Sequence, residues 1–465
     1  MCDGKEAEFS LKVMINKEKT KVLFAEADSH FIDILLSFLT LPLGRIIKVL
    51  HKHYGDETPT IGSLNNLYHN LANLDTLHFT TEAAKQILLN PTSSFEDEIK
   101  QLKLDITDSP PNEYFKCTGF LCLLRFRSIS MYLDNVKRCY SCGGIEIVIE
   151  KEEEVLADAA SGDGVFTMDI APYIIFDDLQ IFPNETGLLG IISIVGIADM
   201  DKAEPIKVTF GFSEIVSLLK ASLISQTPLS DIILSKTRGI KNSVFESETS
   251  LNQIENEQNP NSKKKTLKVV IQKSTGKLVY AQAKEDFVDF LYSFLNIPLG
   301  GVEHLLTGKT CVKAIDNLYR STTDLIDCKY FKSPDMKKRL IEPNVAHGCI
   351  SDNHIFPLTQ KTLPDPYHYR SSWSSSKFPN GKGSYLKGPQ TYQITDDLTV
   401  TPFCIFSILS NLNKQKIHVS DVKEVEMQIG LKEGLSILKA SLTSTSALSD
   451  ALLNNVSIKQ PKTEH

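Results

Sequence analysis

The sequence has no hydrophobic run long enough to cross a membrane. Its longest strongly apolar stretch, Leu188 to Ala198, falls far short of the roughly 20 residues that a membrane helix needs. The first ten residues, MCDGKEAEFS, are polar and acidic and lack the apolar segment of a secretion signal. These absences predict a cytoplasmic or nuclear protein without a membrane partner.

The sequence also lacks the short motifs that mark common catalytic sites. We find no nucleophile elbow, no H-E-x-x-H and no phosphate-binding Walker motif. The net charge of -7 gives no overall attraction to nucleic acid. No catalytic residue and no organic cofactor follow from the sequence, and a protein that is not an enzyme is the preferred interpretation.

What the sequence does contain is an internal duplication. Residues Leu11 to Gly44 align without gaps on Leu267 to Gly300, and 17 of these 34 positions are identical at an offset of 256. Ser217 to Leu234 match Ser436 to Leu453 at 11 of 18 positions, at an offset of 219. The second copy is therefore 37 residues shorter (256 minus 219), and the loss lies in its middle.

Shorter repeated motifs lie between the two blocks. Asn66-Leu67-Tyr68 matches Asn317-Leu318-Tyr319, and the pair Asp177-Asp178 matches Asp396-Asp397. Neighbouring aspartates are residues that divalent metals bind, but they are more common in turns and helix caps. We interpret them as turn residues.

The duplication divides the chain into three parts. Copy one covers residues 9–234, a polar linker covers 235–266, and copy two covers 267–456. The linker has few apolar residues, so its composition predicts a flexible segment. Since each copy has its own strands and helices, residues 1–240 are expected to be soluble alone.

Local patterns predict an α+β module. Leu11, Val13 and Ile15 alternate with polar residues, as in a strand. A turn follows, and Gly276 at this turn in copy two suits a hairpin that needs a positive φ. After a second strand, Phe31, Leu35, Phe38 and Leu39 recur at helical spacing before Pro42 and Gly44 end or bend the helix. This order resembles the opening of a β-grasp fold. A late strand and an amphipathic helix close each copy.

Copy one contains a cluster of cysteines. Cys117, Cys122, Cys139 and Cys142 form two short pairs, followed by Gly143 and Gly144. In a chain without a secretion signal such pairs are typical of a structural zinc site with four thiolate ligands. The pattern predicts a zinc-ribbon-like insert at about residues 114–149, while buried free thiols are the alternative. Copy two has no matching cysteines.

The same insert is locally basic. Residues Tyr114 to Ile149 contain five basic and two acidic side chains, a local charge of +3. Such a surface is typical either of an ordinary solvated face or of contact with a ligand such as nucleic acid or phosphate. The candidate contact residues are Arg125, Arg127, Lys137 and Arg138.

Several motifs together resemble a known plant family. The segment KVLFAEADSHFIDILLSFLTLPLG, the cysteine set ending at Gly143, the Asp-Asp-Leu motif at Asp177 and the LLKASL helices are similar to the family called "domain of unknown function 674". The resemblance implies a plant source and repeated modules. It implies no activity.

Three functional hypotheses remain open. The preferred one is a non-catalytic binding or scaffold protein with a structural zinc and a protein partner, because the positions shared by both copies are mostly apolar or turn residues. The second is binding of nucleic acid or a phosphate ligand through the basic insert. The third is an enzyme of unrecognised type with its site between the copies.

Overall fold

The computed structural model describes most of both copies. The described residues are 7–107, 114–117, 129–131, 146–149, 164–170, 172–184, 190, 203–234, 264–325, 327–361 and 383–453. Most of the predicted linker therefore lies outside them. Copy two begins slightly earlier than the repeat predicts, because its first strand starts at Lys265.

Copy one opens with two strands and a series of helices, and it closes with a strand and two helices. Its elements are β1 (Phe9–Asn16), β2 (Val22–Ala27), α1 (Ser29–Thr40), α2 (Leu43–Tyr54), α3 (Leu64–Asn73), α4 (Glu82–Leu89), α5 (Glu96–Ile99), β6 (Tyr173–Phe176), β7 (Ile181–Pro183), β8 (Ala203–Phe210), α8 (Phe212–Ile224) and α9 (Pro228–Leu234).

Copy two repeats this order. Its elements are β9 (Lys265–Gln272), β10 (Leu278–Lys284), α10 (Glu285–Ser293), the 3-10 turn η6 (Phe294–Asn296), α11 (Leu299–Leu305), α12 (Lys313–Asp324), α13 (Asp327–Tyr330), α14 (Pro334–Ile341), β11 (Thr391–Ile394), β12 (Val400–Pro402), α15 (Ile405–Lys414), β13 (Val422–Ile429), α16 (Leu431–Thr443) and the π-helical turn η9 (Ser449–Leu453).

Each copy builds a five-stranded antiparallel sheet with the same topology. The strand orders are β7-β6-β2-β1-β8 and β12-β11-β10-β9-β13. Even the register repeats: Val13 lies opposite Ala25 and Ile206, and its counterpart Val269 lies opposite Ala281 and Val425. The prediction of a duplicated α+β fold is confirmed. The β-grasp resemblance ends after α1, since a β-grasp sheet contains a parallel strand pair.

The local patterns explain where these elements begin and end. The predicted stripe of α1, with Phe31, Leu35, Phe38 and Leu39, is fully buried. Asp28 caps the start of α1 by accepting a hydrogen bond from the Phe31 amide. Gly276 has a φ of +71° in the β9–β10 turn, as a glycine at that position predicted.

A separate small sheet lies within the predicted insert. It has the order β4-β3-β5, made of β3 (Tyr114–Cys117), β4 (Ile129–Met131) and β5 (Glu146–Ile149). All its pairings are antiparallel, and Cys117 lies opposite Glu146. The strand β5 ends the predicted insert at Ile149, while the zinc ribbon itself stays a prediction.

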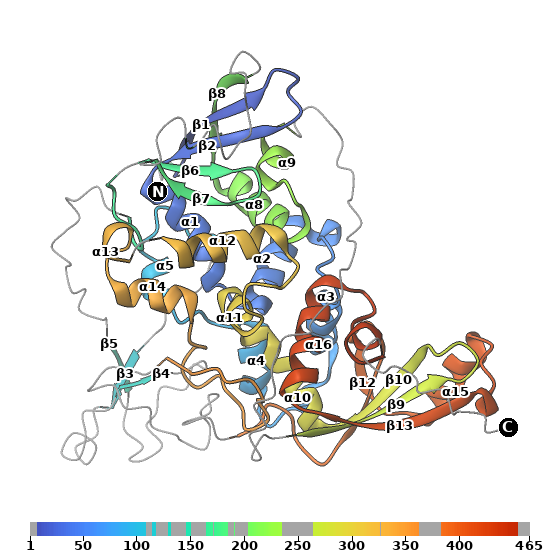
Figure 1. Cartoon of the computed structure of the whole chain (residues 1–465). Helices are drawn as coiled ribbons and strands as arrows, with labels where there is room; N and C mark the ends of the chain where they lie inside the picture. The colour runs from blue at the N-terminus through green and yellow to red at the C-terminus, as the bar shows by residue number, and fades with distance from the viewer. Residues whose placement is uncertain are drawn as a thin grey trace.

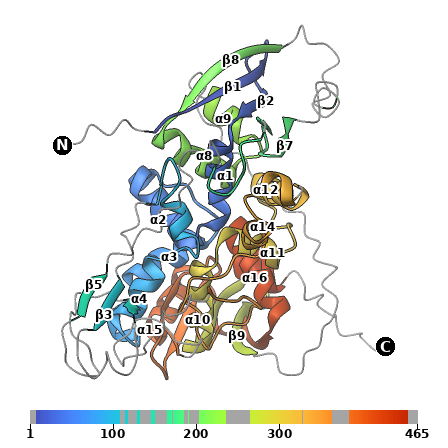
Figure 2. The same cartoon turned by 90° about the vertical axis from the view of Figure 1, so that its left-hand side faces the viewer.

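The two large sheets lie at opposite ends of the molecule, and helices of both copies fill the space between them (Figures 1 and 2). One hydrophobic core runs through this layer and includes Phe31 and Leu39 of copy one together with Phe287 and Leu295 of copy two. A separated copy one would expose this surface to water. The expectation that residues 1–240 are soluble alone therefore does not fit the shared core.

None of the helices within the described ranges is long and apolar enough to span a bilayer.

Cutting the linker is expected to leave the copies together, because the shared core does not depend on the covalent connection. A specific protease site placed within residues 235–263 provides the cut. After cleavage both fragments should elute as one species and unfold in a single transition, like the uncut protein. Elution of a folded, separate copy one would contradict the shared core.

Candidate functional site

The two copies meet along a contact that we call the seam. It is formed by residues 39–44, 62–66 and 78–80 of copy one, residues 295–300, 313–321 and 330–332 of copy two, and the segments that they touch in the opposite copy. A site between the copies would lie along this seam.

At the centre of the seam, two identical Pro-Leu-Gly corners face each other. The Leu43 amide donates to the Ile297 carbonyl at 3.0 Å, and the Leu299 amide donates to the Leu41 carbonyl at 2.9 Å. Pro42 and Pro298 form an antiparallel bridge between these bonds. Since Leu41 corresponds to Ile297 and Leu43 to Leu299, the contact is reciprocal, as around a two-fold axis.

The glycine of each corner allows the backbones to approach closely. A Cβ atom on Gly44 would lie 3.1 Å from the Leu295 side chain, and one on Gly300 would lie 3.0 Å from the Leu39 carbonyl oxygen. Leu39 and Leu295 are counterparts in the repeat. The corner glycines are therefore seam residues in the first turns of α2 and α11, and the break after α1 falls at Leu41 and Pro42.

The repeated Asn-Leu-Tyr and Asp-Asp-Leu motifs form hydrogen bonds with each other across the seam. The Asn66 side chain donates to the Asp397 carboxylate at 3.0 Å, and the Asn317 side chain donates to the Asp178 carbonyl at 3.0 Å. Each aspartate belongs to a turn whose leucine, Leu179 or Leu398, has a φ near +60°. The motif on the middle helix of one copy thus holds a sheet turn of the other.

The first aspartate of each turn binds within its own copy. Asp177 accepts hydrogen bonds from the Ser230 amide and hydroxyl, both at 2.7 Å, and Asp396 accepts the same pair from Ser449 at 2.8 Å. Burial raises the pKa of Asp177 to about 6, although the Ser230 bonds oppose the shift. The turn interpretation of the aspartates is confirmed.

Two buried carboxylates each accept hydrogen bonds from a segment that goes on to contact the opposite copy. Asp33 accepts bonds from the amides of residues 165–167, and its counterpart Asp289 accepts bonds from the amides of Tyr385 and Leu386. Burial raises the pKa of Asp33 to about 7, against the effect of these bonds. Thr167 and Leu386 then bridge to Phe331 and Phe79 of the opposite copies.

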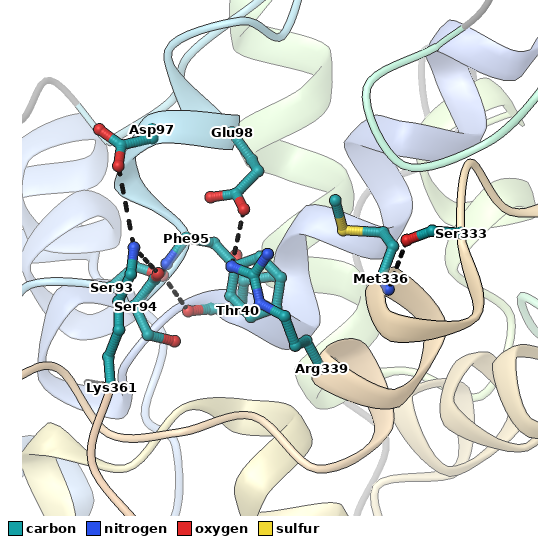
Figure 3. Close-up of polar contacts among 10 residues, drawn as sticks. All are labelled: Thr40, Ser93, Ser94, Phe95, Asp97, Glu98, Ser333, Met336, Arg339 and Lys361. Atoms are coloured by element: carbon teal, nitrogen blue, oxygen red, sulfur yellow. Dashed lines mark hydrogen bonds and ion pairs between the residues drawn. The ribbon is translucent and has the colours of Figure 1, made fainter. Parts of the chain in front are cut away.

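The seam has a charged edge at residues 94–98 of copy one (Figure 3). Arg339 of α14 lies over the Phe95 ring at 4.5 Å and pairs with Glu98 at 2.6 Å. Lys361 donates to the Ser94 carbonyl at 2.8 Å and lies 3.8 Å from Asp97. Side chains of copy two therefore bind residues 94–98 of copy one, which precede the insert in sequence.

A small pocket opens between this edge and the copy-one corner. It contains about 290 Å³ of empty space, open solvent included, and Pro42, Arg45, Ser93, Glu96, Lys100 and Asp105 are among its lining residues. Arg45 is buried, and its Nε donates to the Pro91 carbonyl at 3.1 Å. The enclosed space is only about 10 Å³, room for about one water molecule and far below the roughly 300–1,000 Å³ of small-molecule sites.

A comparison with known families accounts for the whole repeat. A family model described as "Protein of unknown function (DUF674)" matches residues 5–430 and again residues 375–465. The chain belongs to the DUF674 family. No curated protein and no solved structure matches it. The family description names no activity.

The predicted zinc and contact residues of this DUF674 protein lie mostly outside the described residues. This holds for Cys122, Cys139 and Cys142 and for Arg125, Arg127, Lys137 and Arg138, while Cys117 is described by its backbone position on β3. Within the described part of the chain, no group of three or more His, Cys, Asp or Glu side chains is placed to hold a metal ion.

The sequence patterns did not show which residues the repeated polar side chains of this DUF674 protein contact. Identity between the copies marked Asn66 and Asn317 as special, but it did not show that each binds the opposite copy. One signal was available in the sequence. The Asn-Leu-Tyr motif and the Asp-Asp-Leu motif each occur once in each copy, so the two motifs could have been paired with each other.

Close packing at the seam predicts a large effect of Gly62→Ala. Gly62 has a φ of +46°, and a Cβ atom there would lie 2.4 Å from the Ser441 carbonyl oxygen of copy two. The matched control is Gly276→Ala, since Gly276 has a φ of +71° and open space around it.

Both alanines strain the backbone by about 1–2 kcal/mol. Gly62→Ala should lower the free energy of unfolding by about 1–3 kcal/mol more than the control, as overpacking does. Chemical denaturation measures both values. Equal losses in the two variants would argue against tight packing at the seam.

Proposed function

We propose that this DUF674 protein is a non-catalytic binding or scaffold protein. One observation carries the proposal: the shared polar side chains of the seam and the core, such as Asp33 and Asp289 or Asn66 and Asn317, are engaged in contacts within the chain. A catalytic site needs polar groups that converge on a pocket and remain available to a substrate.

Matching bonds in the two copies support this reading. Tyr68 and Tyr319 donate to the carbonyls of Leu89 and Ile341. Lys85 donates to the carbonyls of Ala72 and Leu74, and Lys337 donates to those of Thr323 and Leu325. Together with the asparagine and aspartate bonds of the seam, these contacts give the shared polar positions a structural role.

A substrate screen with structural variants tests the proposal. Asn317→Ala and Asp396→Asn should each lower the free energy of unfolding by about 1–3 kcal/mol, because the first removes a donor and the second removes one of two acceptor oxygens from a partly buried contact. Generic ester, phosphoester and glycoside substrates should show no turnover that depends on either residue. Turnover lost in one variant at an unchanged free energy of unfolding would overturn the proposal.

We also propose that the insert of copy one holds a structural zinc ion through Cys117, Cys122, Cys139 and Cys142. The four-cysteine spacing supports it, and so does the backbone pairing of Cys117 with Glu146, which stands four residues after Cys142 in sequence. Copy two lacks these ligands, so the metal would stabilise the insert and not the shared core. A protein partner is the proposed ligand class of this scaffold.

Metal analysis tests the zinc proposal. Chelator-free purified protein should contain about one zinc per chain, and Cys139→Ser should abolish it because a tetrahedral thiolate site loses one of its ligands. The control Cys404→Ser should keep the metal, since Cys404 is a single exposed thiol at the start of α15. Zinc-free parent protein, or equal loss in both variants, would contradict the site.

A further inference from the structure

Copy two contains a buried pair of carboxyl groups. Glu303 of α11 is 0% exposed, and Asp316 of α12 is half-buried beside it. The Thr310 hydroxyl lies between them, 2.9 Å from Glu303 Oε1 and 2.6 Å from Asp316 Oδ1. This arrangement places two acidic groups around one hydroxyl inside the protein.

Counting protons shows that the pair cannot be fully ionised without leaving a bond unmade. The Thr310 hydroxyl carries one hydrogen and can donate it to one carboxylate. Its oxygen already accepts a bond from the Val312 amide, and the Thr310 amide donates to Asp316. The second carboxyl contact therefore requires a proton on a carboxyl group, and the fully buried Glu303 is the group that favours the neutral form.

The surrounding charges agree with a neutral Glu303. Burial, followed by the charge of Asp316, raises its pKa well above the usual value, while Thr310 and Arg320 act in the opposite direction. The pKa of Tyr319 on α12 is also raised, to about 12, by its burial and then by the charges of Glu303 and Glu342.

The charged side chains on the neighbouring helices contact groups other than Glu303 and Asp316. On α1, Asp33 binds the 165–167 amides, and on α8, Lys220 lies over the Tyr54 ring. On α14, Lys337 donates to the carbonyls at the end of α12, and Arg339 pairs with Glu98.

Copy one provides a natural comparison because it lacks the pair. At the offsets of 256 and 251, Glu303 corresponds to Ile47 and Asp316 to Asn65. Asn65 is neutral and bonds to the Ile61 amide and the Pro59 carbonyl. The helix α3 of copy one is thus an internal control for α12.

The pair stands directly behind the seam. Asn317 and Ser321 of α12 bond to the Asp178 carbonyl and the Ile181 amide of copy one. Lys313 lies 3.5 Å from the Asp178 carboxylate. On α11, Gly300 packs against Leu39. A change in how α11 and α12 pack would therefore alter these contacts between copy two and copy one.

We infer that Glu303, Thr310 and Asp316 form a pH-sensitive latch that holds α11 and α12 against copy one while one proton is shared, and that loosens this half of the seam when the proton is lost. The inference concerns regulation of the fold and does not depend on the proposed scaffold function.

The direction of the pH effect follows from linkage. When the latch opens, Glu303 meets water and ionises at about the ordinary glutamate pKa of 4.3. In the closed latch it ionises only at a higher pH. The stabilisation is therefore complete below the open-state pKa, falls as pH rises, and is lost once pH passes the closed-state pKa.

Hydrogen exchange of the full chain tests the latch. Amide exchange is measured across the range from about pH 5 to about pH 9 and corrected for the intrinsic pH dependence of exchange. Opening of α11 and α12 should increase by up to about tenfold per pH unit within the window between the two pKa values. Helix α3 should show no such increase.

Glu303→Gln separates the latch from general unfolding. The neutral amide can donate to the Thr310 oxygen, which leaves the Thr310 hydrogen for Asp316, as a protonated glutamate does. The pH response of α11 and α12 should therefore disappear. If this variant does not fold, Asp316→Asn, which restores the copy-one residue, should reduce the response because it removes the charge that raises the pKa of Glu303. A parallel response in α3 and α12, or an unchanged response in the folded variant, would overturn the inference.

Discussion

The pairing of the two Pro-Leu-Gly corners is the constraint on which the rest of the structure depends. Each corner interrupts a helix, and its proline has no amide hydrogen to donate. The corner backbone is buried, so its remaining polar groups need partners. They find them in each other, because the Leu43 and Leu299 amides bond to the Ile297 and Leu41 carbonyls. That reciprocal contact brings the helices of both copies into one layer.

Once the corners are joined, the other crossing contacts follow in pairs. Asn66 and Asn317 reach the opposite Asp-Asp-Leu turns, and the segments held by Asp33 and Asp289 reach Phe331 and Phe79. Each copy is therefore completed by the other, as in a symmetric dimer whose subunits have been linked. The shared polar residues maintain this arrangement, and in the proposed scaffold function recognition falls to the parts in which the copies differ.

The copies differ in complementary ways. Copy one carries the cysteine cluster, which copy two lacks, and the small sheet β4-β3-β5, which has no counterpart among the described residues of copy two. Copy two carries the buried Glu303 and Asp316 pair where copy one has Ile47 and Asn65. A duplicated fold can tolerate such changes because the seam is held by many separate contacts, and several of them are backbone bonds that do not depend on side-chain identity. Divergence then adds new chemistry to one copy at a time.

The sequence by itself determined the duplication, the α+β class, the buried stripe of α1, the corners at Pro42 and Pro298 and the turn at Gly276. These features depend on local periodicity and on the backbone preferences of proline and glycine, which a short window of residues contains. Tertiary structure alone decided that Asn66 binds Asp397, 331 residues away, and that Glu303 is buried, although its segment GGVEHLL reads as an ordinary helix. The physical reason is that hydrogen-bond partners and burial at the seam are set by how two distant segments pack, and no local pattern specifies that geometry.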